Sequence, residues 1–234
     1  MAIQAIIEYN DKGFLVYADG FPGTFTRGRE KSEAIQKLPR EVEIYCRWAG
    51  RLCPNESTVN VIEEEYKDIA IEDADTEVLF ESEKSPMSDE DYRELKSLVF
   101  KSAEDVLAVY NSIPDRNRPL MPPREAFHGA VDVTAREMLA HINGVTQYYI
   151  TQIGVSHKNL PDLQINREAA FAALEKPAGF LDSNPVTGSF GEVWSLRKVL
   201  RRFIWHDRIH IKAMYRRANL IWEGKIKDPF SFAL

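Results

Sequence analysis

The chain has 234 residues, a length that allows one large domain or two small ones. Its hydrophobic fraction of 44% is sufficient for a packed core, and charged residues interrupt every long apolar stretch, so no membrane-spanning helix and no membrane partner are expected. The first residues lack the basic start of a signal peptide, and Cys46 and Cys53 are too few for a secreted disulfide scaffold, which predicts two reduced thiols and a cytoplasmic location.

The first 66 residues predict a small α+β domain. Residues 2–9 and 13–18 are rich in β-branched and aromatic side chains and are separated by Asn-Asp-Lys-Gly, which is typical of a β-hairpin. A short strand is expected at 24–27, a helix at 32–48 from its apolar spacing, and a last strand at 58–66. The order β-β-β-α-β predicts one face of an antiparallel sheet buried under one helix.

The rest of the chain predicts an all-α domain. Residues 67–87 are acidic and irregular, and we expect them to be a linker. A helix should begin after the Ser88 N-cap and end near residue 112. Further helices are expected at 132–153, at 166–174 and, longest of all, at 192–220. Residues 88–234 should therefore form a four-helix bundle.

The last helix contains two histidines four residues apart, His206 and His210 in FIWHDRIH, which a helix stacks on one face. At 100° per residue they share their face with Leu196, Val199, Phe203, Ala213 and Met214. The cations on the opposite face are Arg197, Arg201, Arg208 and Lys212. We therefore expect the histidines to point into the bundle and the cations toward water, and nucleic acid is not an expected partner.

His141, on the inward face of the second predicted helix, is a third candidate ligand. A pair of hydrogen-bonded core histidines would explain His206 and His210 alone about as well as a metal site. A third inward histidine favours one divalent metal ion with an open coordination position, as catalytic metal sites have. His128 and His157 lie in loops, where exposure or a local hydrogen bond is expected.

The stretch SLRKVLRRFIWHDRIHIKAMYRR, with EMLAHINGVTQYY upstream, resembles the DinB-like (YfiT-like) family of four-helix-bundle metalloproteins over residues 88–234. The resemblance implies an up-down-down-up bundle, a homodimer, and a zinc or nickel ion held by His141, His206 and His210. It also implies the family's range of activities, which includes thiol-dependent transferases, isomerases and metal-dependent hydrolases.

The stretch EYNDKGFLVYADGFPGTFTRGREKSEAIQKL resembles the HicB-like antitoxin fold over residues 1–66. The residues that carry this resemblance are Pro22, Gly23, Thr24, Ser32 and Ala34. HicB proteins carry a separate DNA-binding module that this sequence does not show. The resemblance therefore implies the fold rather than an antitoxin role.

The sequence identifies no catalytic residue, and four side chains are expected near the ion as positioning groups or substrate contacts. These residues are Glu137, Tyr148, Arg202 and Arg217. Asp207 occupies the acidic position of a loosened HExxH motif, but a local i,i+4 link is the preferred interpretation.

The function expected from these features is a metal-dependent thiol transferase or hydrolase acting on a small molecule, with a thiol cosubstrate. The alternative is a non-catalytic module whose fold is stabilised by the metal and whose HicB-like domain contacts a partner. An open coordination site would favour the first function, and a closed site with four protein ligands would favour the second.

Overall fold

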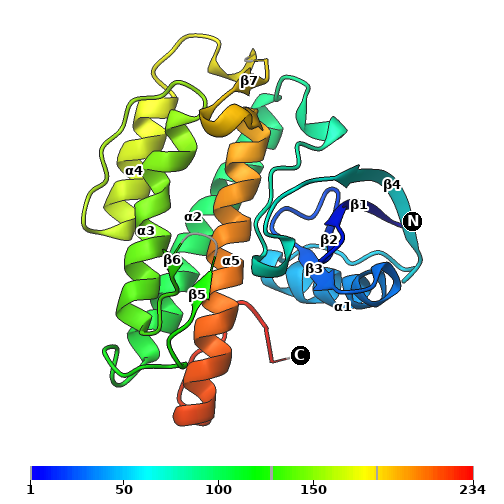
Figure 1. Cartoon of the computed structure of the whole chain (residues 1–234). Helices are drawn as coiled ribbons and strands as arrows, with labels where there is room; N and C mark the ends of the chain where they lie inside the picture. Colours follow the sequence, from blue (N-terminus) through cyan, green and yellow to red (C-terminus); the bar gives the residue numbers. More distant parts are fainter. Residues whose placement is uncertain (1, 127–128, 183, 234) are drawn as a thin grey trace. The chain divides into compact units, whose positions relative to one another are not determined.

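The computed structural model describes residues 2–126, 129–182 and 184–233. They divide into two compact units, one of residues 2–82 with 230–233 and one of residues 83–229 (Figure 1). The expected α+β class is confirmed, since a four-stranded sheet and its helix come first and several helices follow. No helix in the described part of the chain is both long enough and apolar enough to cross a membrane.

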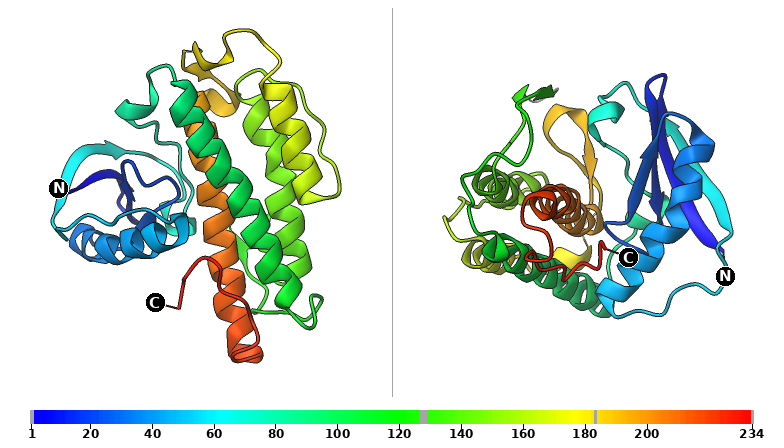
Figure 2. Two further views of the ribbon diagram at one scale, coloured as in Figure 1. Left: turned by 180° about the vertical axis from the view of Figure 1, so that it is seen from behind. Right: turned by 90° about the horizontal axis from the view of Figure 1, so that it is seen from below.

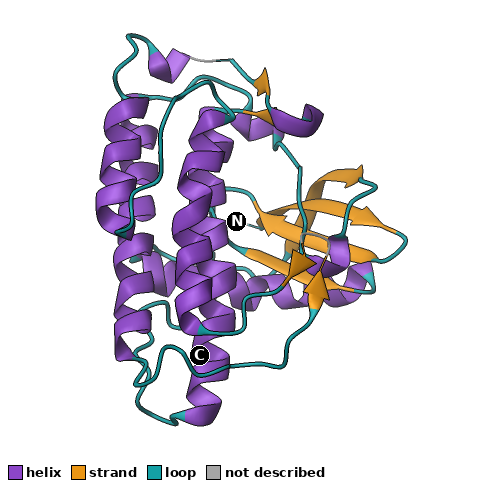
Figure 3. Ribbon diagram, turned by 60° about the vertical axis from the view of Figure 1, so that its left-hand side comes forward, coloured by secondary structure: helices purple, strands orange, loops and turns teal. Residues whose placement is uncertain are grey.

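The first unit contains the larger sheet, drawn in orange in Figure 3. Its strand order is β3-β2-β1-β4. Its strands are β1 (Ile3–Asn10), β2 (Gly13–Ala18), β3 (Phe25–Gly28) and β4 (Val59–Tyr66), and α1 (Lys31–Ala49) lies between β3 and β4 in the chain. The first three strands are antiparallel, but β4 pairs with β1 in parallel. The expected all-antiparallel sheet is wrong because the α1 crossover returns the chain to the same end of the sheet.

Both faces of this sheet are covered. Thr26 donates a hydrogen bond to the carbonyl of Ala34 in α1, so the face that Thr26 shares with its partner Val16 lies under the helix. The next residue, Tyr17, points to the opposite face, where its ring contacts Phe80 at 5.6 Å between centroids. The expected single buried face is therefore corrected to two.

The second face is covered by the segment that was expected to be an acidic linker. Ile71, Val78 and Phe80 are buried, and the Asn10 side chain donates to the backbone carbonyls of Lys67 and Ile69. Residues 67–82 belong to the first unit because the apolar residues among their acidic side chains pack against the sheet. The expected boundary at residue 66 is therefore too early.

The end of the chain also belongs to the first unit rather than to the helical domain expected for residues 88–234. Phe230 is fully buried, and its ring stacks on Trp48 of α1 at 5.3 Å and 21°. Packing this large aromatic side chain against α1 removes its apolar surface from water, which stabilises the return of the chain to α1.

The second unit contains four α-helices among its described residues, together with two short hairpins. The helices are α2 (Asp89–Ser112), α3 (Ala135–Thr151), α4 (Leu163–Leu174) and α5 (Leu196–Ile221). Helix α5 packs against α2 and α3, and α4 packs against the same two helices (Figure 2). The expected Ser88 cap of α2 is confirmed, since its hydroxyl accepts a hydrogen bond from the Asp91 amide.

Two of the four α5 cations that were expected to face water are buried instead. Arg201 and Arg208 are only 4% and 3% exposed. Arg201 donates to both carboxylate oxygens of Glu83, which is itself buried. A buried carboxylate partner allows a guanidinium to leave water, and the helical period alone cannot show that such a partner exists.

The two cysteines differ in their environments, as Cys46 is buried in α1 and Cys53 is exposed, and both are free thiols. Burial and the neighbouring Cys53 raise the pKa of the Cys46 thiol to about 12. Because the thiolate is the reactive form, we expect a thiol reagent at neutral pH to modify Cys53 quickly and Cys46 only after denaturation. Mass spectrometry of labelled protein would count the modified thiols, and rapid double labelling of the folded chain would contradict this expectation.

Candidate metal centre

The three predicted histidines meet at one point in the second unit. Helix α3 carries His141, and α5 carries His206 and His210 one turn apart. One ring nitrogen from each lies within 4.8 Å of the other two. Of the two loop histidines, His157 makes the expected local hydrogen bond, at 2.7 Å to Asn166. The other, His128, lies outside the described residues.

The two helices are positioned by their own N-terminal caps. Thr134 and Glu137 form a capping box at the start of α3, and the Ser195 hydroxyl accepts from the Lys198 amide at the start of α5. Both caps satisfy backbone donors that would otherwise lack a partner in the first turn. Packing of α3 against α5 then brings His141 beside the i,i+4 pair.

The spacing of the ring nitrogens suits a shared ion. The Nε2 atoms of His141 and His206 are 3.0 Å apart, and the three ring centroids are separated by 4.3 to 4.9 Å. Two imidazoles that each bind one zinc ion at about 2.0–2.1 Å place their nitrogens about 3 Å apart. The Nε2 atoms of His141 and His206 therefore already have the spacing of a shared ion, and a ring nitrogen of His210 lies within 4.8 Å of both.

His206 is the most buried of the three, with 5% of its surface exposed. Burial lowers the pKa of His206 well below its ordinary value, and the adjacent His210 and His141 lower it further. Its Nδ1 has no hydrogen-bond partner within the described residues. Neutral imidazole is the form that a metal ion binds, so the buried ring can act as a ligand near neutral pH through Nε2, the nitrogen that faces His141.

Two neighbours of the cluster were missed from the sequence. A carboxylate oxygen of Asp132 lies 3.6 Å from His141 Nδ1, and the ring of Tyr149 meets that of His206 edge-on at 5.9 Å and 84°. The helix expected from residue 132 begins only at Ala135, so Asp132 precedes α3 and the helical period could not place it beside His141. A carboxylate next to the outer nitrogen of a ligand histidine is a common means of orienting the ring.

The four side chains that were expected near the ion as positioning groups or substrate contacts lie in different surroundings. The Glu137 carboxylate accepts from the backbone of Val133 and Thr134, so it caps α3 instead of facing the ion as expected. Arg217 is exposed, which matches a surface cation. The Tyr148 ring contacts Tyr149 and Trp194.

Arg202 is one of these four residues, and its charge acts on the histidine cluster. Its guanidinium lies over the rings of Tyr149 and Trp205 at 5.5 and 4.7 Å. Its positive charge is among the causes that lower the pKa of His206. Arg202 is therefore a buried cation beside the histidines, which helps to keep His206 neutral.

Asp207 does not make the local link that was expected from the sequence. It is fully buried, and its two oxygens accept from the guanidinium of Arg167 in α4 at 2.9 and 3.2 Å. A carboxylate held by this bidentate pair is not available as the general base of a metalloprotease.

No family model, curated protein or solved structure matches this chain. The geometry of the histidine cluster and the chemistry of its side chains are therefore the features that indicate its function.

Proposed function

We propose that the second unit is a DinB-like four-helix bundle in which His141, His206 and His210 hold one divalent ion, zinc or nickel. The observation that carries the proposal is the convergence of three ring nitrogens from two helices, with a buried, neutral imidazole among them. The packing of α5 and α4 each against α2 and α3 supports the bundle. Three nitrogen ligands suit zinc and nickel, and affinity order alone does not choose between them.

We further propose that the protein is a metal-dependent thiol transferase or hydrolase of a small molecule. The His141 side chain is 34% exposed and His210 is half-buried, so one side of the cluster is open to solvent. A bound divalent ion would supply Lewis-acid charge that favours the thiolate or hydroxide form of a nucleophile. The open side supports a catalytic site over a closed structural one.

The residues of the chain itself would set the environment of that chemistry. Tyr149 and Trp205 are buried and lie against His206, where they exclude water from the inner side of the cluster. Asp132 would orient the His141 ring through its outer nitrogen. The thiol cosubstrate, the homodimer and the HicB-like character of the first unit are parts of the proposal that rest on resemblance.

The activity is tested with protein purified without chelator or His-tag, supplied with zinc or nickel and checked by metal analysis. We expect thiol transfer, or ester or amide hydrolysis, to fall at least about 10- to 100-fold in His210→Ala. Removing a residue that only orients a metal ligand already has an effect of this size, and this variant removes a proposed ligand itself. His157→Ala is the matched control, because that histidine bonds to Asn166 outside the cluster. Metal-loaded wild type with no rate above His210→Ala would favour the non-catalytic, metal-stapled module.

A further inference from the structure

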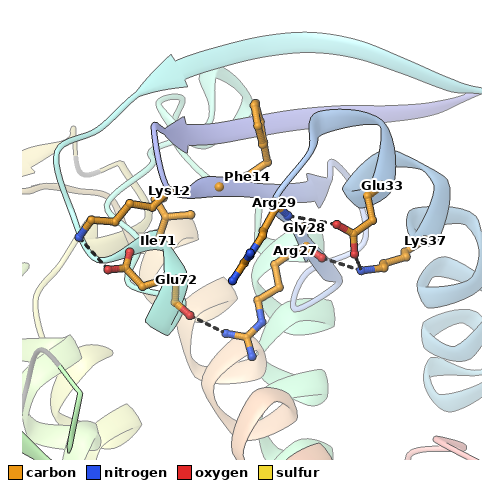
Figure 4. A pocket seen from close by; sticks show the side chains of 10 residues that line it. Lys12, Phe14, Arg27, Gly28, Arg29, Glu33, Lys37, Ile71 and Glu72 are labelled. Carbon is orange, nitrogen blue, oxygen red and sulfur yellow. Dashed lines mark hydrogen bonds and ion pairs between the residues drawn. The ribbon is translucent and has the colours of Figure 1, made fainter.

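The first unit contains a pocket of about 500 Å³ that has no part in the histidine cluster (Figure 4). Its walls come from the start of β2, the end of β3, the first turns of α1 and the short 3₁₀ helix Ile71–Asp73. This volume lies within the range of small-molecule binding sites and is larger than an inorganic anion requires.

Most of the charged groups in the pocket are cations. Four basic and two acidic side chains line it, and each acid already has a lysine partner. Lys12 binds Glu72 at 2.7 Å, and Lys37 binds Glu33 at 2.5 Å. The remaining two charges are those of arginines, so the pocket has an excess of two positive charges although the chain as a whole is acidic.

The two arginines are Arg27 and Arg29, and neither is paired with a carboxylate of the described chain. Arg27 donates to the backbone carbonyl of Glu72 at 3.1 Å, which is a neutral acceptor. Arg29 uses its backbone amide to bind Glu33, at 3.1 Å, and its guanidinium remains available. Figure 4 shows both guanidinium groups between the Lys12–Glu72 and Lys37–Glu33 pairs.

Glycines allow the walls of this pocket to approach one another. A Cβ atom on Gly13 would lie 2.9 Å from the carbonyl oxygen of Gly28, and a Cβ on Gly28 would lie 2.9 Å from the backbone nitrogen of Ala34. Cβ atoms in proteins essentially never come this close to backbone atoms, so β2, β3 and α1 meet at this spacing because both positions are glycine. The start of α1 at this wall adds the positive end of its dipole to the arginine charges.

From this arrangement we propose that the first unit binds a small phosphomonoester, with its phosphate between Arg27 and Arg29. A phosphate monoester carries about −1.5 to −2 charges at neutral pH, which matches the excess charge of the pocket, whereas one carboxylate would neutralise half of it. Guanidinium groups also match phosphate geometry through paired hydrogen bonds. The rest of the pocket accommodates the organic part of the ligand.

The test is an NMR titration of the full ¹⁵N-labelled chain, at constant ionic strength and with chelator present to empty the histidine site. Inorganic phosphate, adenosine monophosphate and adenosine are the probes. We expect both phosphates to shift the amides of Gly13 and Gly28 saturably, with the nucleotide binding more tightly than inorganic phosphate. Adenosine alone should leave these amides unmoved.

Arg29→Gln should weaken the binding of the nucleotide at least about tenfold, which is the loss expected for a charge-assisted hydrogen bond. Arg47→Gln is the matched control, since Arg47 is an exposed arginine of α1 whose partner is Glu43 and which does not line the pocket. Thermal melts would verify that both variants are folded. The proposal is overturned if no probe gives saturable shifts, if adenosine binds as well as its phosphate, or if both variants weaken binding equally.

Discussion

Replacing Asp207 with alanine is expected to reduce the free energy of unfolding by about 3–5 kcal/mol, the usual cost of breaking a buried ion pair from one side. Asp207 and Arg167 are both 0% exposed and are joined by two hydrogen bonds. The Arg167 guanidinium also lies 4.3 Å from the centre of the Phe203 ring. Without Asp207, a full positive charge would remain in an apolar environment without its carboxylate.

Urea denaturation with chelator present would measure this loss without a contribution from metal, because Asp207 directly follows a candidate ligand. An Arg167→Met, Asp207→Leu double variant should recover much of the stability, since it removes both charges and retains apolar volume. Arg40→Ala is a control that removes an exposed pair with Glu43 and should change stability by less than about 1 kcal/mol. An Asp207→Ala loss as small as that of Arg40→Ala would show that the buried pair contributes little.

Adding zinc to chelator-treated protein is expected to stabilise the fold by about 4 kcal/mol when free zinc is about 1,000 times the Kd. The folded chain presents three ring nitrogens within 4.8 Å of one another, an arrangement that the unfolded chain has lost. Because the pKa of His206 is lowered by folding, the unfolded chain takes up the additional proton as pH falls below about 6.5. Stability of the metal-free protein should therefore decrease on acidification, and the stabilisation by zinc should decrease with it.

Calorimetric melting temperatures with and without zinc would check this prediction. The His206→Ala, His210→Ala double variant should show no increase with zinc, whereas His157→Ala should respond as the wild type does. If zinc raised the melting temperatures of all three proteins equally, its binding would lie outside the histidine cluster and the metal proposal would be wrong.

The local elements of this protein follow from its sequence. Residues 13–18 form a strand as their β-branched and aromatic pattern predicts, and Ser88 caps α2 through the hydrogen bond expected of its position. The i,i+4 spacing of His206 and His210 places both rings on one side of α5, at 4.3 Å between centroids. These features depend on neighbours within one or two turns, where side-chain chemistry and helical period are sufficient.

Only the tertiary structure decides which distant groups become partners. The Arg167–Asp207 pair joins residues 40 apart in sequence, and the Arg201–Glu83 pair joins residues 118 apart. At 100° per residue Arg201 falls on the face opposite the histidines, and a period cannot show that a carboxylate from another segment will meet it there. A charge can be buried only where its attraction to such a partner offsets the free energy of its lost hydration. This balance is a property of the packed chain rather than of any single helix.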